Sequence, residues 1–314
     1  MRKSLAILFI LYFSLFTSSL AQHRIVFTPE WTAQAEFTGY YVAKEKGFYK
    51  EEGLEVDIVH PTLSQSVLSR LLNGECQATT FQLSQALEIV DQGVKLVNIL
   101  QTSMNDAMVI ISARGKNPLE QKGAHVGIAS MGYSHLAQCM SKKEGLDYQW
   151  HPAARPVNLY LAGAVDAIIG MSFNEMYQLM QSGCRFSEKE IFRFSDHGYN
   201  IQGEGLYMTY EYYNKHRRDA HNFAKASRRG WEWAAQHPDE AIEIVSKYIK
   251  KSRIATNREL QRLMLKEVLR LQIDKKTGKR EFLLKPDMVR QACRLMMKFG
   301  ILSREISYLE LIER

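Results

Sequence analysis

The chain has 314 residues, with 41 Lys and Arg against 34 Asp and Glu, a formal net charge of +7 at neutral pH. Its basic residues are spread out, with short groups at 215–218, 228–229 and 275–280, whereas a nucleic-acid-binding protein concentrates them on one face. We therefore expect no nucleic-acid partner and a monomer. The length favours two lobes over one small core.

Residues 1–21 have the layout of a secretory signal peptide. Two basic residues precede an apolar stretch over residues 5–16, and Ser-Ser-Leu-Ala closes the segment. We predict cleavage after Ala21 and release into the periplasm as a soluble protein with a net charge of +5, from 39 basic and 34 acidic residues. A retained N-terminal anchor is the alternative. No later segment approaches the roughly 18 uncharged residues that a spanning helix needs.

Strands and helices alternate through the first part of the mature chain. RIVFT at 24–28 and LEVDIV at 54–59 are typical of strands, and a helix is predicted between them over 33–46. A second helix over 67–72 ends at Asn73-Gly74, a left-handed helix stop. Strand, helix and strand follow as QATTF, SQALEIVDQ and KLVNILQ. Such alternation needs crossover helices over a mostly parallel sheet, so the predicted class is α/β.

The alternation begins again after a connection rich in Gly, Pro and Lys, and a crossing into a second lobe is predicted near Ala113. The elements expected there are the strand HVGIA, a helix over 134–143, the strand YQWHP, a short helix over 157–162, the strand VDAIIG and a helix over 174–181. A return crossing follows over 191–209, and amphipathic helices fill the rest. The expected domains are a signal peptide at 1–21, the first part of lobe 1 at 22–112, lobe 2 at 113–205, and a return to lobe 1 with C-terminal helices at 206–314.

The four cysteines, Cys76, Cys139, Cys184 and Cys293, are scattered without a CxxC pair, so neither zinc nor redox chemistry is expected. Burial as small apolar residues is favoured. One disulfide, for example Cys139 to Cys184, is the alternative that an oxidising compartment allows. The chain also has no HExxH or GxSxG motif, so we expect no catalytic residues, metal or cofactor.

Aromatic residues cluster after the first strand, at Trp31, Phe37, Tyr40 and Tyr41. Flat heteroaromatic ligands stack on Trp and Tyr rings, although an aromatic stripe at helical spacing is more often part of a core. We give Phe37 and Tyr41 more weight as core residues than Trp31 and Tyr40. One residue is about 100° of helix, so Tyr40 is predicted to face a cleft and Tyr41 the core.

Asn174 and Glu175 lie just past the buried-looking strand VDAIIG and therefore at the carboxyl edge of a sheet, where α/β proteins bind ligands. A carboxylate there can accept a hydrogen bond from an amino group. The alternative is that Glu175 only complements a helix dipole.

Several motifs share their order and spacing with a known family. They are Trp31, Phe37, GYYVA at 39–43, EKGFY at 45–49, EGL at 52–54, GAVDA at 163–167, FNE at 173–175, DHGY at 196–199, RGWEWA at 229–234 and HPDEA at 237–241. Together they resemble the NMT/THI-like family of type II periplasmic solute-binding proteins over nearly the whole mature chain. The resemblance implies a two-lobed fold that closes over a small solute and delivers it to an ABC permease in the inner membrane. It does not name the solute, for which we expect a heteroaromatic compound and, above all, a thiamine pyrimidine precursor.

The resemblance also implies ligand-binding positions. In pyrimidine-binding members the ligand stacks on aromatic rings and is bound by a carboxylate and amides, and the matching residues here are Trp31, Phe37, Tyr40, Asn174, Glu175 and Tyr199. The loop after the strand HVGIA commonly supplies backbone N–H groups to the ligand. Gly132 and Tyr133 are its expected contributors, and helix N-termini favour anionic groups in general.

Two alternatives to transport come from the same family. Its fungal branch contains thiamine-pyrimidine synthases, which use a lysine-bound pyridoxal phosphate and a consumed histidine. The positions of that lysine and histidine fall at Phe81 and Gln85, neither of which can do this chemistry, so an enzyme is not expected. Domains of this type also serve membrane sensor kinases as periplasmic inputs. An adjacent permease gene favours transport, whereas an adjacent regulator gene favours sensing.

Overall fold

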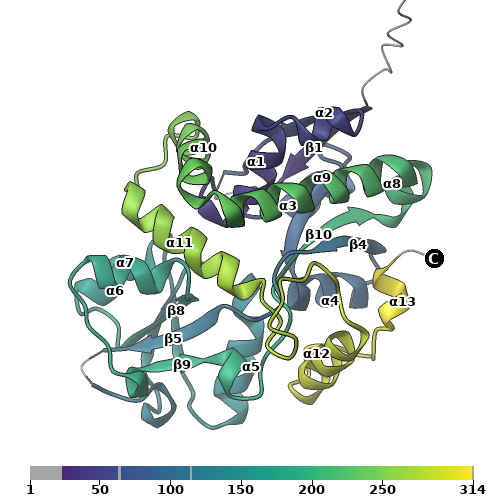
Figure 1. Cartoon of the computed structure of the whole chain (residues 1–314). Coiled ribbons are helices and arrows are strands. Elements are labelled where there is room, and N and C mark those ends of the chain that lie inside the picture. Colours follow the sequence, from purple (N-terminus) through teal and green to yellow (C-terminus); the bar gives the residue numbers. More distant parts are fainter. Residues whose placement is uncertain (1–22, 63–64, 114, 313–314) are drawn as a thin grey trace, which may run out of the picture.

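The structure, a computed structural model, describes residues 23–62, 65–113 and 115–312, without the side chain of Tyr133. The predicted signal peptide over residues 1–21 lies outside these residues. Within them the strands form two five-stranded sheets. Figure 1 shows the sheet of β5, β8 and β9 with helices α5, α6 and α7 at the lower left, and β1, β4 and β10 with a separate set of helices above and to the right.

The first sheet has the strand order β2-β1-β3-β10-β4. Its strands are β1 (His23–Thr28), β2 (Leu54–Ile58), β3 (Ala78–Gln82), β4 (Leu96–Gln101) and β10 (Glu204–Thr209). β1 pairs in parallel with β2 and β3, and β10 runs antiparallel to β3 and β4. The alternation that predicted β2 is confirmed, because Leu54 and Val56 are buried while Glu55 is exposed.

The second sheet repeats this plan with the order β7-β6-β8-β5-β9. Its strands are β5 (Met108–Ser112), β6 (His125–Ile128), β7 (Gln149–Pro152), β8 (Ala167–Met171) and β9 (Ile191–Arg193). β6 is parallel to β7 and β8, and β5 is antiparallel to β8 and β9. Each sheet is therefore mixed but mostly parallel, as predicted, because four of its five strands run in one direction and only β10 or β5 runs against them. Crossover helices make neighbouring strands parallel, whereas β5 and β10 each enter their sheet directly from the other one.

Helices cover both sheets. The helices before β10 are α1 (Thr38–Glu45), α2 (Phe48–Glu51), α3 (Val67–Leu72), α4 (Leu83–Asp91), α5 (His135–Lys143), α6 (Pro156–Leu161) and α7 (Glu175–Gln181). Those after it are α8 (Tyr210–Lys215), α9 (Arg217–Gln236), α10 (Pro238–Lys251), α11 (Arg258–Leu271), α12 (Pro286–Lys298) and α13 (Tyr308–Leu311). In Figure 1, α11 runs from the end of α10 down beside α7.

The helix predicted over 33–46 begins later than expected. A 3-10 turn, η1 (Ala35–Phe37), comes first, and α1 starts at Thr38. The N–H of Ala35 donates to Gln261 Oε1 of α11 at 2.7 Å, so a distant helix holds this turn in place. The stop predicted at Asn73-Gly74 is confirmed, since α3 ends at Leu72 and Gly74 has φ of +75°.

All four cysteines fall within the described residues and are free. Cys76 and Cys293 are buried, as favoured, and Cys139 and Cys184 are half-buried. Among the described helices, every one is too short or too polar to cross a membrane.

Candidate functional site

A pocket of about 430 Å³ lies where elements of the two sheets face each other. One wall comes from the segment after β1, from the end of β3 and from α4; the other comes from the segments that follow β6 and β8. The strands β1 and β3 are parallel to each other, and so are β6 and β8. Their carboxyl ends therefore lie at one edge of each sheet, which is the usual place for ligands in α/β folds. The volume suits a small organic ligand.

Four of the residues predicted to bind ligand line this pocket: Trp31, Gly132, Asn174 and Glu175. Trp31 is half-buried and packs on the core of the first sheet. Gly132 lies in a 3-10 turn, η3 (Gly132–Ser134), and is exposed. Tyr133 belongs to the same turn, but its side chain is outside the described part of the structure. Segments distant in sequence thus converge on one pocket.

The structure places Tyr40 in the core, contrary to the prediction that it faces the cleft. Its side chain is fully buried, with its ring 4.6 Å from that of Phe27 and 5.9 Å from that of Trp231. The prediction assumed that one face of the helix is exposed, so that a step of about 100° separates a cleft residue from a core residue. In the structure α1 is covered by both α9 and α10, and every residue from Thr38 to Ala43 is buried.

Phe37 and Tyr199 also lie away from the residues that line the pocket. Phe37 is fully buried beside the ring of His60, at 5.4 Å. Tyr199 packs against Phe194 and Phe299 in a second core cluster. Aromatic character alone does not distinguish a pocket wall from a core contact, so these positions required the tertiary structure.

Glu175 folds back over the end of β8. Its Oε2 accepts from the N–H of Met171 at 2.8 Å, and its Oε1 accepts from Asn174 Nδ2 at 2.9 Å. A Cβ on Gly170 would lie 2.6 Å from the Glu175 side chain, so glycine makes room for this arrangement. Burial raises the pKa of Glu175. Each oxygen of the Glu175 carboxylate thus accepts one hydrogen bond within the protein and has a second lone pair with which it can accept from a ligand in the pocket.

Three further carboxylates, of Glu30, Glu36 and Glu204, gather at the inner end of the pocket, with oxygen atoms within 4.8 Å of one another. Glu30 and Glu36 line the main pocket. Glu36 and Glu204 line a cavity of about 20 Å³ that shares Glu36, Gln82 and Phe173 with it. Burial raises the pKa of Glu30 to about 7 and that of Glu36 to about 8, and it raises that of Glu204 further above its usual range.

The sequence interpretation did not select these three carboxylates. Glu30 could have been found, because it follows β1 as Glu175 follows β8. Glu36 lies within the helix predicted over 33–46, and Glu204 lies on a strand that had been assigned to a crossing, so neither carried a local signal. The pocket also contains Phe81 and Gln85, the positions that the family resemblance had aligned with a lysine and a histidine.

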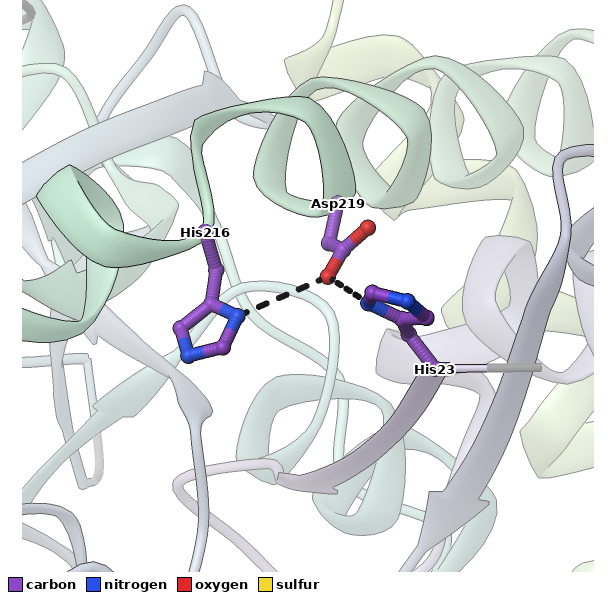
Figure 2. A group of neighbouring side chains, drawn as sticks. All are labelled: His23, His216 and Asp219. Atoms are coloured by element: carbon purple, nitrogen blue, oxygen red, sulfur yellow. Dashed lines mark hydrogen bonds and ion pairs between the residues drawn. The ribbon is translucent and has the colours of Figure 1, made fainter. Parts of the chain in front are cut away.

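A second cluster of polar side chains lies away from the pocket (Figure 2). Asp219 Oδ2 is 2.6 Å from His23 Nδ1 and 3.6 Å from His216 Nδ1, and their ligand atoms are spaced closely enough to hold a metal ion. A structural role accounts for the same geometry. Asp219 lies in the first turn of α9, where a carboxylate complements the helix dipole, and it links β1 to that helix.

Comparison with known proteins gives concordant matches. The family model described as "NMT1/THI5 like" matches residues 34–241. A formylaminopyrimidine-binding protein of Halalkalibacterium halodurans is 26% identical over 228 residues, which are 69% of this chain and 68% of that protein.

Solved structures show the same architecture. The ligand-binding component of an ABC-type import system from Staphylococcus aureus, determined with zinc bound, has a TM-score of 0.69 and 11% identity over 93% of this chain and 97% of that one. The periplasmic aliphatic sulphonate-binding protein of Escherichia coli has a TM-score of 0.64 and 14% identity over 93% and 92% of the two chains. At these identities the likeness establishes the periplasmic binding protein fold and no more.

Proposed function

The chain belongs to the NMT1/THI5-like family, and from this premise we propose that it is an exported solute-binding protein of an ABC importer. Its pocket would bind a small heteroaromatic solute, a thiamine pyrimidine precursor, and pass it to a permease in the inner membrane. The name of the Halalkalibacterium relative supports a pyrimidine ligand.

The observation that carries this proposal is the chemical character of the pocket. Trp31 offers an aromatic face, and the amide of Asn174 and the carboxylate of Glu175 lie on the opposite wall. A flat ring can stack on the indole while its ring nitrogens and amino groups bond to the amide and the carboxylate. An aminopyrimidine presents this combination of a flat face and edge donors.

The charge of the pocket supports the same class of solute. Its lining includes four carboxylates, of Glu30, Glu36, Glu88 and Glu175, and among the described residues that line it none is Lys, Arg or His. A desolvated anion would find no cation there to offset its charge, and it would repel these carboxyl groups whenever they are ionised, so an anionic solute is disfavoured. The aliphatic sulphonate named for the Escherichia coli neighbour is therefore a poor candidate here.

We also propose that the protein is not an enzyme. Phe81 and Gln85 line the pocket at the positions where the resemblance places a lysine and a histidine in the synthases. A phenyl ring cannot form the Schiff base that holds pyridoxal phosphate, and an amide cannot replace an imidazole. Incubation with pyridoxal phosphate should give no Schiff-base absorbance band, and such a band together with pyrimidine formation would contradict this proposal.

Native mass spectrometry of protein purified from the exported fraction without refolding tests the proposed function. A closed cleft retains a tightly bound solute, so we expect a co-purified mass that fits an aminopyrimidine. An anionic solute in the pocket, or another compound without a flat ring, would contradict the assignment. N-terminal sequencing of the same sample should return Gln22, as cleavage after Ala21 requires; a sequence that starts at Met1 would contradict the predicted processing.

A further inference from the structure

Glu30, Glu36 and Glu204 share a small volume, and among the described residues none of the three forms an ion pair with Lys, Arg or His. Glu36 and Glu204 are only 6% exposed, and Glu30 is half-buried. The titratable groups that act on them from neighbouring elements are Glu175 of α7, Tyr40 and Tyr41 of α1, and Tyr207 of β10. None of these groups is a cation, and three ionised carboxylates this close would repel one another strongly in a buried site.

Each of the three carboxylates has one bonded oxygen and one free oxygen. Glu30 Oε1 accepts from Gln82 Nε2 at 3.0 Å, Glu36 Oε2 from Gln34 Nε2 at 2.5 Å, and Glu204 Oε2 from Thr102 Oγ1 at 3.3 Å. Among the described residues, no hydrogen bond of good geometry reaches Glu30 Oε2, Glu36 Oε1 or Glu204 Oε1. The last of these atoms is fully buried, and the Thr80 hydroxyl lies close to the Glu204 carboxyl group.

Other polar atoms at the same place are buried without a hydrogen bond of good geometry. Trp231 Nε1 and Tyr40 Oη make no such bond among the described residues, although the two groups lie close to each other and Tyr40 Oη lies close to the Thr102 hydroxyl, and both side chains are fully buried. Trp231 lines the small cavity together with Glu36 and Glu204. An unmade hydrogen bond costs roughly 1–3 kcal/mol for each such group, so the arrangement has the character of a binding site rather than of a packed core.

We propose that Glu30, Glu36 and Glu204 form a cation subsite at the inner end of the pocket, which holds protons in the unliganded protein and exchanges them for a positively charged nitrogen of the solute. This inference rests on the proposed function, and it adds the charge class of the solute. A protonated amine has three N–H donors, which matches the three free carboxylate oxygens.

The geometry favours a nitrogen cation over a metal ion. Divalent calcium requires six to eight oxygen ligands, and magnesium a nearly octahedral set. Here three carboxylate oxygens are free, and the Trp231 indole, which can only donate, lines the same cavity. A solute nitrogen needs fewer partners, and it can reach the subsite from the main pocket because Glu30 and Glu36 line that pocket.

The exchange makes binding depend on pH. The pKa values of the three carboxyl groups are raised, so protons occupy the subsite at neutral pH and must leave when a cation binds. Affinity for a cationic solute should therefore increase as pH rises through about 7 and 8, the values for Glu30 and Glu36. A neutral solute of the same shape should not show this increase.

Calorimetric titration with two matched pairs of probes tests the subsite. The first pair is 4-amino-5-aminomethyl-2-methylpyrimidine, whose side-chain amine is charged, and its neutral 5-hydroxymethyl analogue. The second pair is benzamidine and neutral benzamide, which are flat but unrelated to thiamine. At pH 8 we expect the charged member of at least one pair to bind about tenfold or more tightly than the neutral member, a difference of about 1.4 kcal/mol. Titration in buffers of different ionisation enthalpy should show proton release with the charged member alone.

Variants assign the effect to these residues. Glu36→Gln and Glu204→Gln should each remove most of the charge preference and reduce proton release. The control is Asp106→Asn, because burial also raises the pKa of Asp106 to about 7 but Asp106 does not line the pocket. The infrared carbonyl band of protonated carboxyl groups, measured at pH 6.5 without ligand, should weaken in both Glu variants. This measurement reports the loss of a protonated carboxyl group even in a variant that binds no ligand.

The outcomes separate this inference from the proposed function. Binding of benzamidine with proton release, without binding of either pyrimidine, would support the subsite and contradict the pyrimidine assignment. Equal binding of the hydroxymethyl and aminomethyl pyrimidines without proton release would overturn the subsite and leave the proposed solute class intact. Binding of none of the four probes, or retention of a divalent metal at the three carboxylates, would overturn the subsite.

Discussion

The hydroxyl of Tyr41 lies 2.6 Å from Nε2 of His60, and Nδ1 of the same ring lies 2.6 Å from the carbonyl oxygen of Trp31. A carbonyl oxygen can only accept, so Nδ1 carries the hydrogen, and Nε2 of the neutral ring accepts a hydrogen bond from the Tyr41 hydroxyl. The buried aromatic of α1 is thereby linked through His60 to the backbone of Trp31, the residue that lines the pocket. Burial lowers the pKa of His60 to about 4.

This lowered pKa predicts acid sensitivity. In the unfolded chain the imidazole has its ordinary pKa near 6.5, so between about pH 6.5 and 4 the unfolded state binds more protons than the folded state. The free energy of unfolding should therefore fall as the pH drops through this window, and His60 should contribute about 1–3 kcal/mol to that loss. Melting temperatures between pH 6.5 and 4 should fall less in His60→Gln than in the parent. The exposed His197 provides the control His197→Gln, and equal slopes in parent and His60→Gln would show the prediction to be wrong.

Trp31 and Tyr41 should respond differently to truncation. Trp31→Ala removes an aromatic wall of the pocket and should weaken pyrimidine binding by roughly 1–3 kcal/mol, the scale of base stacking on an aromatic side chain. Tyr41→Ala removes a fully buried ring stacked on Tyr248, with centroids 4.1 Å apart, and should reduce stability by about 3–5 kcal/mol. Calorimetric titration and thermal unfolding of both variants measure the two effects. Unchanged affinity in Trp31→Ala would show that the solute does not stack on Trp31.

Glu175→Gln should weaken a solute that bears an amino group more than one that lacks it. The amide has one acceptor oxygen in place of two, and the N–H of Met171 already requires an acceptor at that position. We expect a loss of about 1–2 kcal/mol for an aminopyrimidine, the cost of one charge-assisted hydrogen bond. Titration of the amino compound and of its desamino analogue gives the comparison, and an equal loss for both would indicate a purely structural role.

Gly230→Ala should destabilise the protein without contact to the pocket. A Cβ at Gly230 in α9 would lie 2.0 Å from the carbonyl oxygen of Gly39 in α1, so the two helices would have to separate. We expect a loss of roughly 1–3 kcal/mol, as for other overpacked cores, measured by denaturant unfolding. Gly132→Ala is the control, because a Cβ there meets only Ser130 Oγ, at 3.8 Å. Similar stabilities for the two variants would argue against a close α1–α9 contact.

Local patterns in the sequence were sufficient for most of the elements. The alternation in LEVDIV predicted β2, and the Asn73-Gly74 stop correctly ended α3, because each depends on contacts within a few residues. The position of Glu175 was also accessible, since a residue a few positions past the end of a buried strand lies near the edge of the sheet.

Other features depended on parts of the chain that are distant in sequence. The 3-10 turn before α1 is bonded at Ala35 to Gln261, more than 200 residues away, and the burial of Tyr40 follows from α9 and α10, which cover the helix on more than one side. Long-range contacts of this kind leave no periodic signal in the segment that they change.

The sequence by itself determined the α/β class and the placement of Trp31, Asn174 and Glu175 after strands, because hydrophobic spacing and the succession of elements along the chain are visible locally. Only the tertiary structure decided that Tyr40 belongs to the core and that Glu30, Glu36 and Glu204 meet in one site. The physical reason is that β10 returns from the second sheet to pair with β3, which places the carboxylate of residue 204 beside two that lie near the start of the chain.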